Sequence, residues 1–431
     1  MEAGFATVDY TPEPGLALQG QMHERRATHA RDPLQACAAA FRSGDEPPVV
    51  VVAIDLCTFR TDGVAAVQRA FAARTGLDGR RLLVSATHSH VAPCSSSFLR
   101  GDADPRFVDA LWTAIVSAAE ASLAALEPVT LHAGSAKLEQ LGWNRRGMFA
   151  DGTSRMYGGS SSPGFVGLEG PRDPELSVLA TRDAQGELRG VVLSFGTHPN
   201  CLESECFYSA DLPGEVRRLL RAVHGPGCGV VYLTGPAGNV APSVLDPQPP
   251  TQPWRGEVGL RRSGEYLAGA ALQVVAAAHE PLADVLRLEQ AEPLIGLRPW
   301  PEPDAPNYPL PLRGDTWPDA RGYYERQQAL WPTLPDPEPV RLNVLRLGEA
   351  ALCTSPTELF VEHGLCIRAD SPARVNLLAE LTDGYCGYVP TTLAFSRGGY
   401  ETWPAYSSRL ACDAGERIAA ETAALLRRAW A

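Results

Sequence analysis

The sequence predicts an α/β fold, one large domain with a mixed β-sheet core flanked by helices. Continuous β-branched runs such as residues 47–55 are typical of strands covered on both faces. Amphipathic helical patterns alternate with these runs in the first half of the chain. Pairs of strand patterns separated by short turns add antiparallel hairpins. At 431 residues the chain is long enough to bury a large core.

The first half alternates predicted strands and helices. Residues 47–55 and 81–86 are predicted strands, with a helix at 64–74 between them. The clearest helical pattern runs over residues 108–126, where the apolar side chains share one face. Pro105, just ahead of this pattern, suits a helix start.

The second half adds hairpins and a long insertion. The remaining predicted elements are a hairpin at 175–181 and 188–197, a strand at 229–233, a hairpin at 340–347 and 350–354, a helix near Leu359, a strand at 374–378 and a helix at 416–430. Residues 246–339 are dense in proline and aromatic side chains and are expected to form an irregular insertion within the one domain. No internal repeat is apparent in the sequence.

Charge and composition exclude several classes of function. A formal net charge of −12 argues against a nucleic-acid partner, because phosphate binding needs a clustered positive face. The N-terminus lacks the pattern of a signal peptide, and no run reaches the roughly 18 to 20 apolar residues of a membrane span. Ten cysteines are scattered without a disulfide framework. We expect a cytoplasmic protein without an integral membrane segment that acts on a small molecule; a homo-oligomer stays open.

Histidines and acids stand just past the ends of predicted strands. Asp55, His88, His90 and His198 all do so, and such strand ends are where α/β folds collect their ligands. His88 and His90 would project to the same side if the strand direction persisted. Imidazole is a common zinc ligand, so these histidines predict a metal site. The alternative at this stage is that they are hydrogen-bonded structural residues.

Several short segments, in the same order along the chain, resemble motifs of the neutral ceramidases. Residues 87–93 (THSHVAP) resemble THTHSGP after a matching apolar strand, and Asn144-Arg145 resembles NRS. The other matching segments are 196–198 with 209–214, 238–242 (GNVAP, resembling GDVSP), 356–358 (PTE, resembling PGE), 385–391 and 400–401. The resemblance spans roughly residues 3 to 428.

The resemblance implies the catalytic domain of a zinc amidohydrolase. Carried over residue by residue, one zinc ion per chain would be held by His88, His198, Glu358 and Tyr388, with His90, Arg145 and Tyr400 at the reaction centre. Residues expected to bind substrate or support these side chains are Asp55, Asn144, Asp211, Gly238 and Asn239. The immunoglobulin-like C-terminal domain of full-length ceramidases is not expected here. Another divalent transition metal, such as manganese or iron, stays possible.

The chain departs from the family pattern at one motif. The serine of GDVSP is Ala241 here, and the acidic position before it is Asn239. Hydrolysis by metal-activated water needs no serine, because a bound metal lowers the pKa of water from about 15.7 toward about 7. The sequence therefore predicts hydrolysis of the amide bond of an N-acylated small molecule, whose acyl group is apolar. Two alternatives are an ester or lactone hydrolase at the same metal and a catalytically silent ligand-binding relative.

Overall fold

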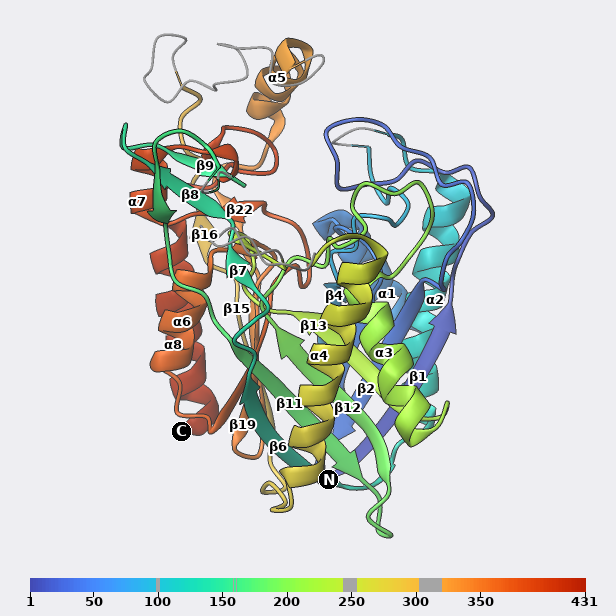
Figure 1. The fold of residues 1–431 in the computed structure, drawn as a ribbon. Helices are drawn as coiled ribbons and strands as arrows, with labels where there is room; N and C mark the ends of the chain where they lie inside the picture. Colours follow the sequence, from blue (N-terminus) through green and yellow to red (C-terminus); the bar gives the residue numbers. More distant parts are fainter. Residues whose placement is uncertain (98–100, 158, 160, 243–253, 302–319) are drawn as a thin grey trace.

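Three mixed sheets hold most of the strands of this protein (Figure 1). The computed structural model describes residues 1–97, 101–157, 159, 161–242, 254–301 and 320–431. The strand orders are β4-β3-β2-β1-β5, β13-β12-β11-β6 and β15-β18-β19-β21. In each sheet the first three strands along the chain pair antiparallel, and the fourth pairs parallel with the third. The first sheet has a fifth strand, β5, which pairs antiparallel with β1.

The same order of elements builds each sheet. In the first unit it is β1 (Glu2–Asp9), β2 (Gln35–Arg42), β3 (Val49–Ile54), α1 (Thr61–Thr75), β4 (Leu82–Ala86) and α2 (Pro105–Ala124). In the second it is β6 (Thr130–Lys137), β11 (Glu175–Arg182), β12 (Leu188–Phe195), α3 (Asp211–His224), β13 (Gly229–Thr234) and α4 (Gly256–Ala277). In the third it is β15 (Leu286–Ala291), β18 (Leu342–Leu347), β19 (Ala350–Thr354), α6 (Val361–Ala369), β21 (Val375–Ala379) and α8 (Ala414–Trp430).

The fold therefore contains an internal repeat that the sequence analysis missed. A β-β-β-α-β-α unit occurs three times, with the same strand pairing each time. Connections of different length separate the corresponding strands, and the first two strands of the second unit are almost forty residues apart. The repeat lies in backbone pairing and layer order, which many sequences satisfy, and so it leaves no pattern of matching side chains.

The three units share one central core. Alternate side chains of each sheet point inward to a common apolar cluster, and the others point outward to that unit's own helices. Val49 and Val51 of β3 face the centre, whereas Val50 and Val52 face α1 and α2. Helices α3 and α4 cover the second sheet, and α6 and α8 cover the third (Figure 1). Burial on both faces explains why residues 47–55 read as a continuous apolar run.

The carboxyl ends of the parallel strands meet near the centre. The Ala86 backbone N–H at the end of β4 donates to the Leu381 carbonyl, 3.0 Å away, just past β21. The Glu380 N–H donates to the Thr234 carbonyl of β13 over 2.9 Å. The Thr234 hydroxyl in turn donates to the Thr87 carbonyl over 2.8 Å. These bonds join the three units where the loops that carry the candidate site begin.

Short elements complete the fold around these loops. They are η1 (Gly79–Arg81), β5 (Glu127–Pro128), β7 (Trp143–Asn144), β8 (Arg146–Phe149), β9 (Ser154–Met156), β10 (Phe165–Leu168), β14 (Val240–Ala241), β16 (Leu294–Ile295), α5 (Ala320–Leu330), η3 (Trp331–Thr333), β17 (Glu338–Pro339), β20 (Glu358–Leu359), β22 (Tyr388–Val389), α7 (Thr392–Arg397) and η4 (Tyr400–Thr402).

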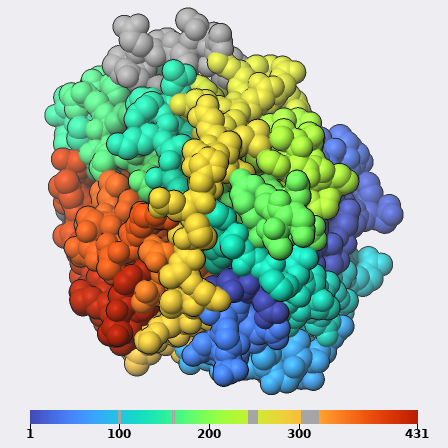
Figure 2. All heavy atoms as spheres, turned by 90° about the horizontal axis from the view of Figure 1, so that it is seen from below, coloured from blue at the N-terminus to red at the C-terminus, as the bar shows by residue number. Residues whose placement is uncertain are grey.

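The predicted α/β class is confirmed, but the expected irregular insertion at 246–339 is wrong in its described part. That part holds α4, which packs on α3, and β15, which pairs with β18. Figure 2 shows these residues, in yellow, running between the N-terminal and C-terminal parts of the chain. Helix α4 is rich in alanine and glycine, so its buried face gives a weak apolar pattern. Residues 246–253 and 302–319, with Tyr308 and Trp317, lie outside the described residues.

Among the described residues, α2 is long and apolar enough to cross a membrane by length and composition alone. It packs against β1, β2 and α1, which is the ordinary place of a core helix. One such helix is weak support for a membrane span.

Candidate metal centre and its pocket

A pocket of about 630 Å³ opens where the loops of the three units meet. Its walls combine histidines, a buried arginine and acid, and a group of aromatic side chains. The residues that matter for chemistry are Cys57, His88, His90, Arg145, Asn200, Glu203, Glu358, Tyr385, Tyr388, Tyr400 and Trp403.

Three predicted ligands converge beside this pocket, one from each unit. His88 follows β4, His198 follows β12, and Glu358 follows β19. The Glu358 Oε2 atom lies 3.4 Å from His88 Nε2 and 3.4 Å from His198 Nε2. All three side chains are buried. Residues 270 positions apart in the sequence thus form one cluster with the spacing of a metal site.

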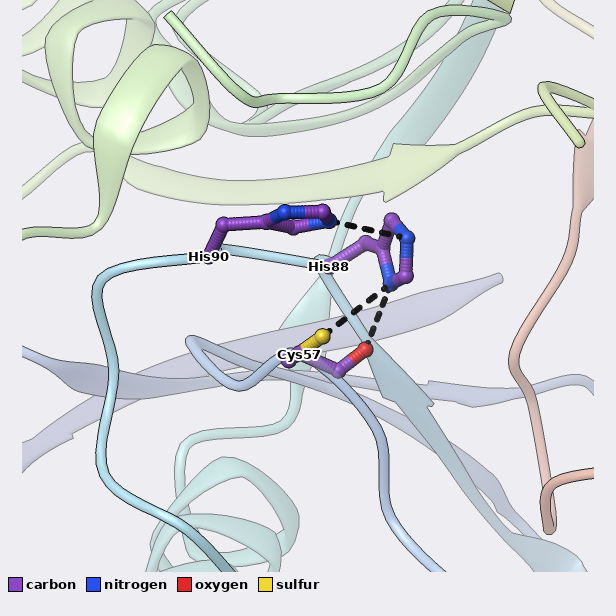
Figure 3. Close-up of side chains that lie close together, drawn as sticks. All are labelled: Cys57, His88 and His90. Carbon is purple, nitrogen blue, oxygen red and sulfur yellow. Dashed lines mark hydrogen bonds between the residues drawn. The ribbon is translucent and has the colours of Figure 1, made fainter. Parts of the chain in front are cut away.

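Backbone carbonyls orient both histidines. His88 Nδ1 donates to the Cys57 carbonyl over 2.6 Å, and His198 Nδ1 donates to the Ala237 carbonyl over 2.7 Å. Figure 3 shows His88 held between this carbonyl and His90. A proton on Nδ1 leaves the lone pair of a neutral imidazole on Nε2, the atom that faces Glu358. Both rings are therefore oriented with Nε2 toward Glu358, as two metal ligands would be.

The electrostatics of the cluster call for a positive charge at its centre. His198 Nε2 and Glu358 Oε2 have no hydrogen-bond partner among the described residues. Burial, helped by the charges of Arg145 and His88, lowers the pKa of His198 to about 3, which keeps this ring neutral. Burial opposes a charge on Glu358, but the neighbouring His88 and His198 outweigh it and lower the pKa of Glu358 well below its usual range.

The donor set fits a zinc ion. Zinc takes imidazole nitrogens and carboxylate oxygens at about 2.0–2.2 Å in a tetrahedron, whose corners are then about 3.4 Å apart. The nitrogen–oxygen separations of 3.4 Å in this cluster match that edge. Two neutral imidazoles and a carboxylate would leave the ion with a net positive charge.

Tyr388, the fourth predicted ligand, lies next to this cluster in the same pocket. It pairs directly with Glu358 in the parallel β20–β22 ladder, so the two side chains share one face. Arg145 Nη2 donates to Tyr388 Oη over 3.2 Å. Burial, and then the Glu358 charge, raise the pKa of Tyr388 well above its usual range.

Arg145 is a buried member of the pocket wall. Its Nε donates to Glu401 Oε1 over 2.9 Å, and Arg146 Nη1 donates to the other Glu401 oxygen over 2.7 Å. Glu401 therefore bridges two adjacent buried arginines, and Glu169, which pairs with Arg146, supplies the second negative charge. The bonds to Glu401 and to Tyr388 together fix the position of the Arg145 guanidinium.

His90 and Tyr400, both predicted to lie at the reaction centre, also line the pocket. His90 Nε2 lies 3.3 Å from His88 Nε2, and its Nδ1 lies 3.7 Å from Glu203 Oε2. The Tyr400 ring packs at 5.6 Å from the Tyr388 ring, between centroids. The sequence analysis expected His88 and His90 to share a side because the strand would continue through them, and this reason is wrong. His88 has a left-handed φ of 69°, so the strand direction ends there. The turn that follows returns His90 to the same side.

Asp55 and Asp211, which were predicted to support the ligand histidines or to form turns, contact neither histidine. Asp55 pairs with Arg217 through both carboxylate oxygens and also accepts from the Gln35 N–H over 2.8 Å. Asp211, the first residue of α3, accepts from the N–H groups of Cys201 and Leu202. The backbone carbonyls of Cys57 and Ala237, and not these carboxylates, orient the two histidines.

Asn144, Gly238 and Asn239 also lie outside the described pocket lining. Asn144 accepts from the Arg146 N–H, and Asn239 binds the Val361 N–H and the Glu362 side chain. Gly238 packs behind the metal cluster: a Cβ there would lie 2.4 Å from the Glu358 carbonyl oxygen. Its backbone approaches Glu358 and not, as expected, a substrate. Ala241, at the position of the family serine, is buried on β14 against β7.

Five of the pocket residues named above escaped the sequence analysis as site residues: Cys57, Asn200, Glu203, Tyr385 and Trp403. Tyr385 donates to Glu358 Oε1 over 2.7 Å and fixes the ligand carboxylate. Cys57 is one of the ten scattered cysteines, and Glu203 lies in a segment without a periodic pattern. Tyr385 lies in segment 385–391, one of those that resemble the family motifs, and this resemblance could have indicated it as a site residue. Cys57 offered only its position after a strand, which Asp55 shares.

The fold and cluster define a class: a three-unit α/β protein with a histidine–carboxylate cluster at its strand ends that could hold a metal ion. The chain is 30% identical over 128 residues to the neutral ceramidase of Pseudomonas aeruginosa, a match over 28% of this chain and 18% of that protein. No family model matches the chain.

Solved structures extend the likeness to the whole fold. The crystal structure of neutral ceramidase from Pseudomonas aeruginosa aligns with a TM-score of 0.77 at 19% identity, covering 99% of this chain and 74% of that one. A ceramidase complexed with C2 aligns with a TM-score of 0.75 at 18% identity, with the same coverage. The chain is thus similar to neutral ceramidases in its fold and, over a short segment, in its sequence, so the resemblance that the motifs predicted is confirmed.

Proposed function

We propose that this protein is a zinc-dependent hydrolase that cleaves the amide bond of an N-acylated small molecule. The single observation that carries the proposal is the convergence of His88, His198 and Glu358, each from a different unit, with their metal-binding atoms facing one another. The likeness to a neutral ceramidase in fold and in part of the sequence supports the amide bond as the target.

His88, His198 and Glu358 would hold the zinc ion, with Tyr388 beside them as a fourth ligand that binds through its phenolic oxygen. When bound, zinc supplies Lewis acidity and lowers the pKa of a water molecule at this centre. Arg145 supplies a fixed positive charge at the pocket wall, where negative charge develops on the carbonyl oxygen during attack. Its ion pair with Glu401 holds this charge in place without mobile side chains.

Tyr400 and His90 both line the pocket that the reacting amide would occupy. Tyr400 carries a phenolic hydroxyl that can donate to the same developing oxyanion, and burial raises its pKa well above the usual range. Burial lowers the pKa of His90 well below its usual range, so its ring is neutral at the start. It can take up the proton that the attacking water releases and pass it to the amine, which is a poor leaving group until it is protonated. Ala241 takes no part in these steps.

The pocket also suits an apolar acyl group. Met22, Met156 and Trp403 line it together with Tyr400, so that one wall is sulfur-containing and aromatic. Such walls accommodate acyl chains by apolar contact and impose little demand for directed hydrogen bonds. Glu203 and Asn200 line the polar side beside His90.

The test is metal content together with hydrolysis. Purified protein should contain about one zinc per chain by elemental analysis, and His88→Ala and His198→Ala should each lose it. His132→Ala is the matched control, since His132 is a buried histidine on β6 away from the described pocket lining. A folded wild-type protein that stays metal-free with zinc supplied would contradict the proposal. Matched N-acyl amide and ester substrates then distinguish amide from ester or lactone hydrolysis.

A further inference from the structure

Glu380 is a buried carboxyl group that the proposed chemistry does not use. It follows β21 directly, at the junction where the three units are joined, and its side chain is completely buried. It lies outside the described lining of the large pocket. A buried acid away from the reacting groups needs a structural or positional reason, because burial of a carboxyl group is costly.

The hydrogen bonds of Glu380 connect two segments from different units. Its Oε2 accepts from the Ala237 N–H over 3.1 Å and from the Leu359 N–H over 3.0 Å. The same two segments also bind each other, because the Gly238 N–H donates to the Leu359 carbonyl over 3.0 Å. One carboxylate oxygen thus closes a ring of backbone hydrogen bonds behind the metal cluster.

Each segment of this ring carries a proposed metal ligand. The Ala237 carbonyl is the group that accepts from His198 Nδ1, and Leu359 directly follows Glu358. We propose that Glu380 is a positioning residue that holds His198 and Glu358 at their mutual distance by clamping the backbone segments of Ala237 and Leu359. This inference rests on the proposed zinc site, and we refer to Glu380, Ala237 and Leu359 as the clamp.

The surroundings of Glu380 suit a fixed, neutral group. Its Oε1 has no hydrogen-bond partner among the described residues. Glu380 also borders a small cavity of about 10 Å³, together with Ser355 and Thr354. Burial raises the pKa of Glu380 well above its usual range. Glutamine has the same length and the same acceptor oxygen, so it can keep both clamp bonds. Aspartate is one carbon shorter and cannot reach both N–H groups without backbone movement.

The experiment compares Glu380→Ala, Glu380→Asp and Glu380→Gln with Asp383→Ala. Asp383 is the matched control: it is equally buried and accepts from the Val84 N–H and from Asn343, neither of which adjoins a proposed ligand. Zinc affinity is measured by competition with a chromophoric chelator, and folding by thermal melting. We expect Glu380→Ala and Glu380→Asp to bind zinc about 10–100-fold more weakly, as for other groups that orient ligands. Glu380→Gln and Asp383→Ala should stay within about threefold of wild type.

A second readout does not depend on metal. In zinc-free protein labelled with ¹⁵N-histidine, wild type and Glu380→Gln should show His198 protonated at Nδ1, whereas Glu380→Asp should show a mixture of tautomers. Unchanged zinc affinity and an unchanged His198 tautomer in folded Glu380→Asp would overturn the clamp, as would an equal loss of zinc in Asp383→Ala. If wild type binds no zinc, the proposed function fails, and the histidine spectra still decide the role of Glu380.

Discussion

The three units are alike in fold but differ where their third strand ends. Cys57 stands three residues after β3, His198 three residues after β12, and Glu358 four residues after β19. All three lie beside the same centre. His198 and Glu358 direct side-chain acceptor atoms into it, whereas Cys57 contributes its backbone carbonyl to His88.

The comparison shows that a repeated scaffold provides equivalent positions and the residue type decides their use. In the first unit the acid near the end of the third strand, Asp55, forms an ion pair with Arg217 and does not face the site. The third unit keeps its acid, Glu358, without a permanent cation. A buried acid with an arginine is a structural ion pair, and a buried acid facing the Nε2 atoms of two histidines is a candidate site for a metal cation.

The largest effect should come from Glu358→Gln, which keeps the shape and removes the charge. We expect zinc affinity to fall more than about 100-fold, since a ligand is lost and not only its support. Hydrolysis should fall in parallel. Chelator competition and turnover of an N-acyl substrate measure the two. Zinc binding equal to wild type would show that Glu358 is not a ligand and would dissolve the contrast with Asp55.

Asp55→Asn tests the other side of the comparison. Arg217 would remain buried without its counter-charge, and breaking such a pair costs about 3–5 kcal/mol. Denaturant unfolding should show this loss, while zinc per folded chain stays near one. A variant of normal stability, or one that is folded but metal-free, would place Asp55 in the site after all.

Tyr385→Phe should have a smaller effect on the centre. Phenylalanine keeps the ring but removes the donor to Glu358 Oε1. Loss of one orienting hydrogen bond should weaken zinc about tenfold, measured by the same competition assay. The neighbouring Tyr406→Phe is a suitable control, because Tyr406 lies outside the described pocket lining. Identical affinity in both variants would deny Tyr385 this role.

The second unit also has a buried acid, Asp211, which accepts hydrogen bonds from backbone N–H groups. The pH dependence of stability tests how this environment differs from those of Asp55 and Glu358. Burial raises the pKa of Asp211 to about 7. The folded state then binds more protons than the unfolded state between about pH 4 and pH 7, so this group's contribution to stability decreases as pH rises through that window. Its slope is at most about 1.4 kcal/mol per pH unit. Asp211→Asn should flatten the pH dependence of unfolding; an unchanged profile would contradict the shift.

The smallest effect is expected for Cys57→Ala. The backbone carbonyl that orients His88 is retained, and only the sulfur is lost. Stability should fall by about 1 kcal/mol or less, and zinc affinity should not change. A clear loss of zinc in this variant would mean that the Cys57 side chain, as well as its carbonyl, takes part in the centre.

Much of the fold could be predicted from local pattern. The strands at β3, β4, β12, β13, β19 and β21 and the helices α1, α2 and α8 carry strong apolar periodicity. The less distinct elements were missed: β1 and β2 are rich in small residues, and α4 buries alanine and glycine. Periodicity measures side-chain contrast, so elements that pack through small side chains give little signal.

By itself, the sequence determined the α/β class, the strand ends as the place of the site, and through motif resemblance the identity of the residues that converge there. Only the tertiary structure decided what each of them contacts. It assigned Asp55 to Arg217, gave the orientation of His88 and His198 to backbone carbonyls, and placed Tyr385 and Glu380 behind Glu358. The physical reason is that such contacts join chain segments from different units, and their partners are backbone groups that every residue type carries.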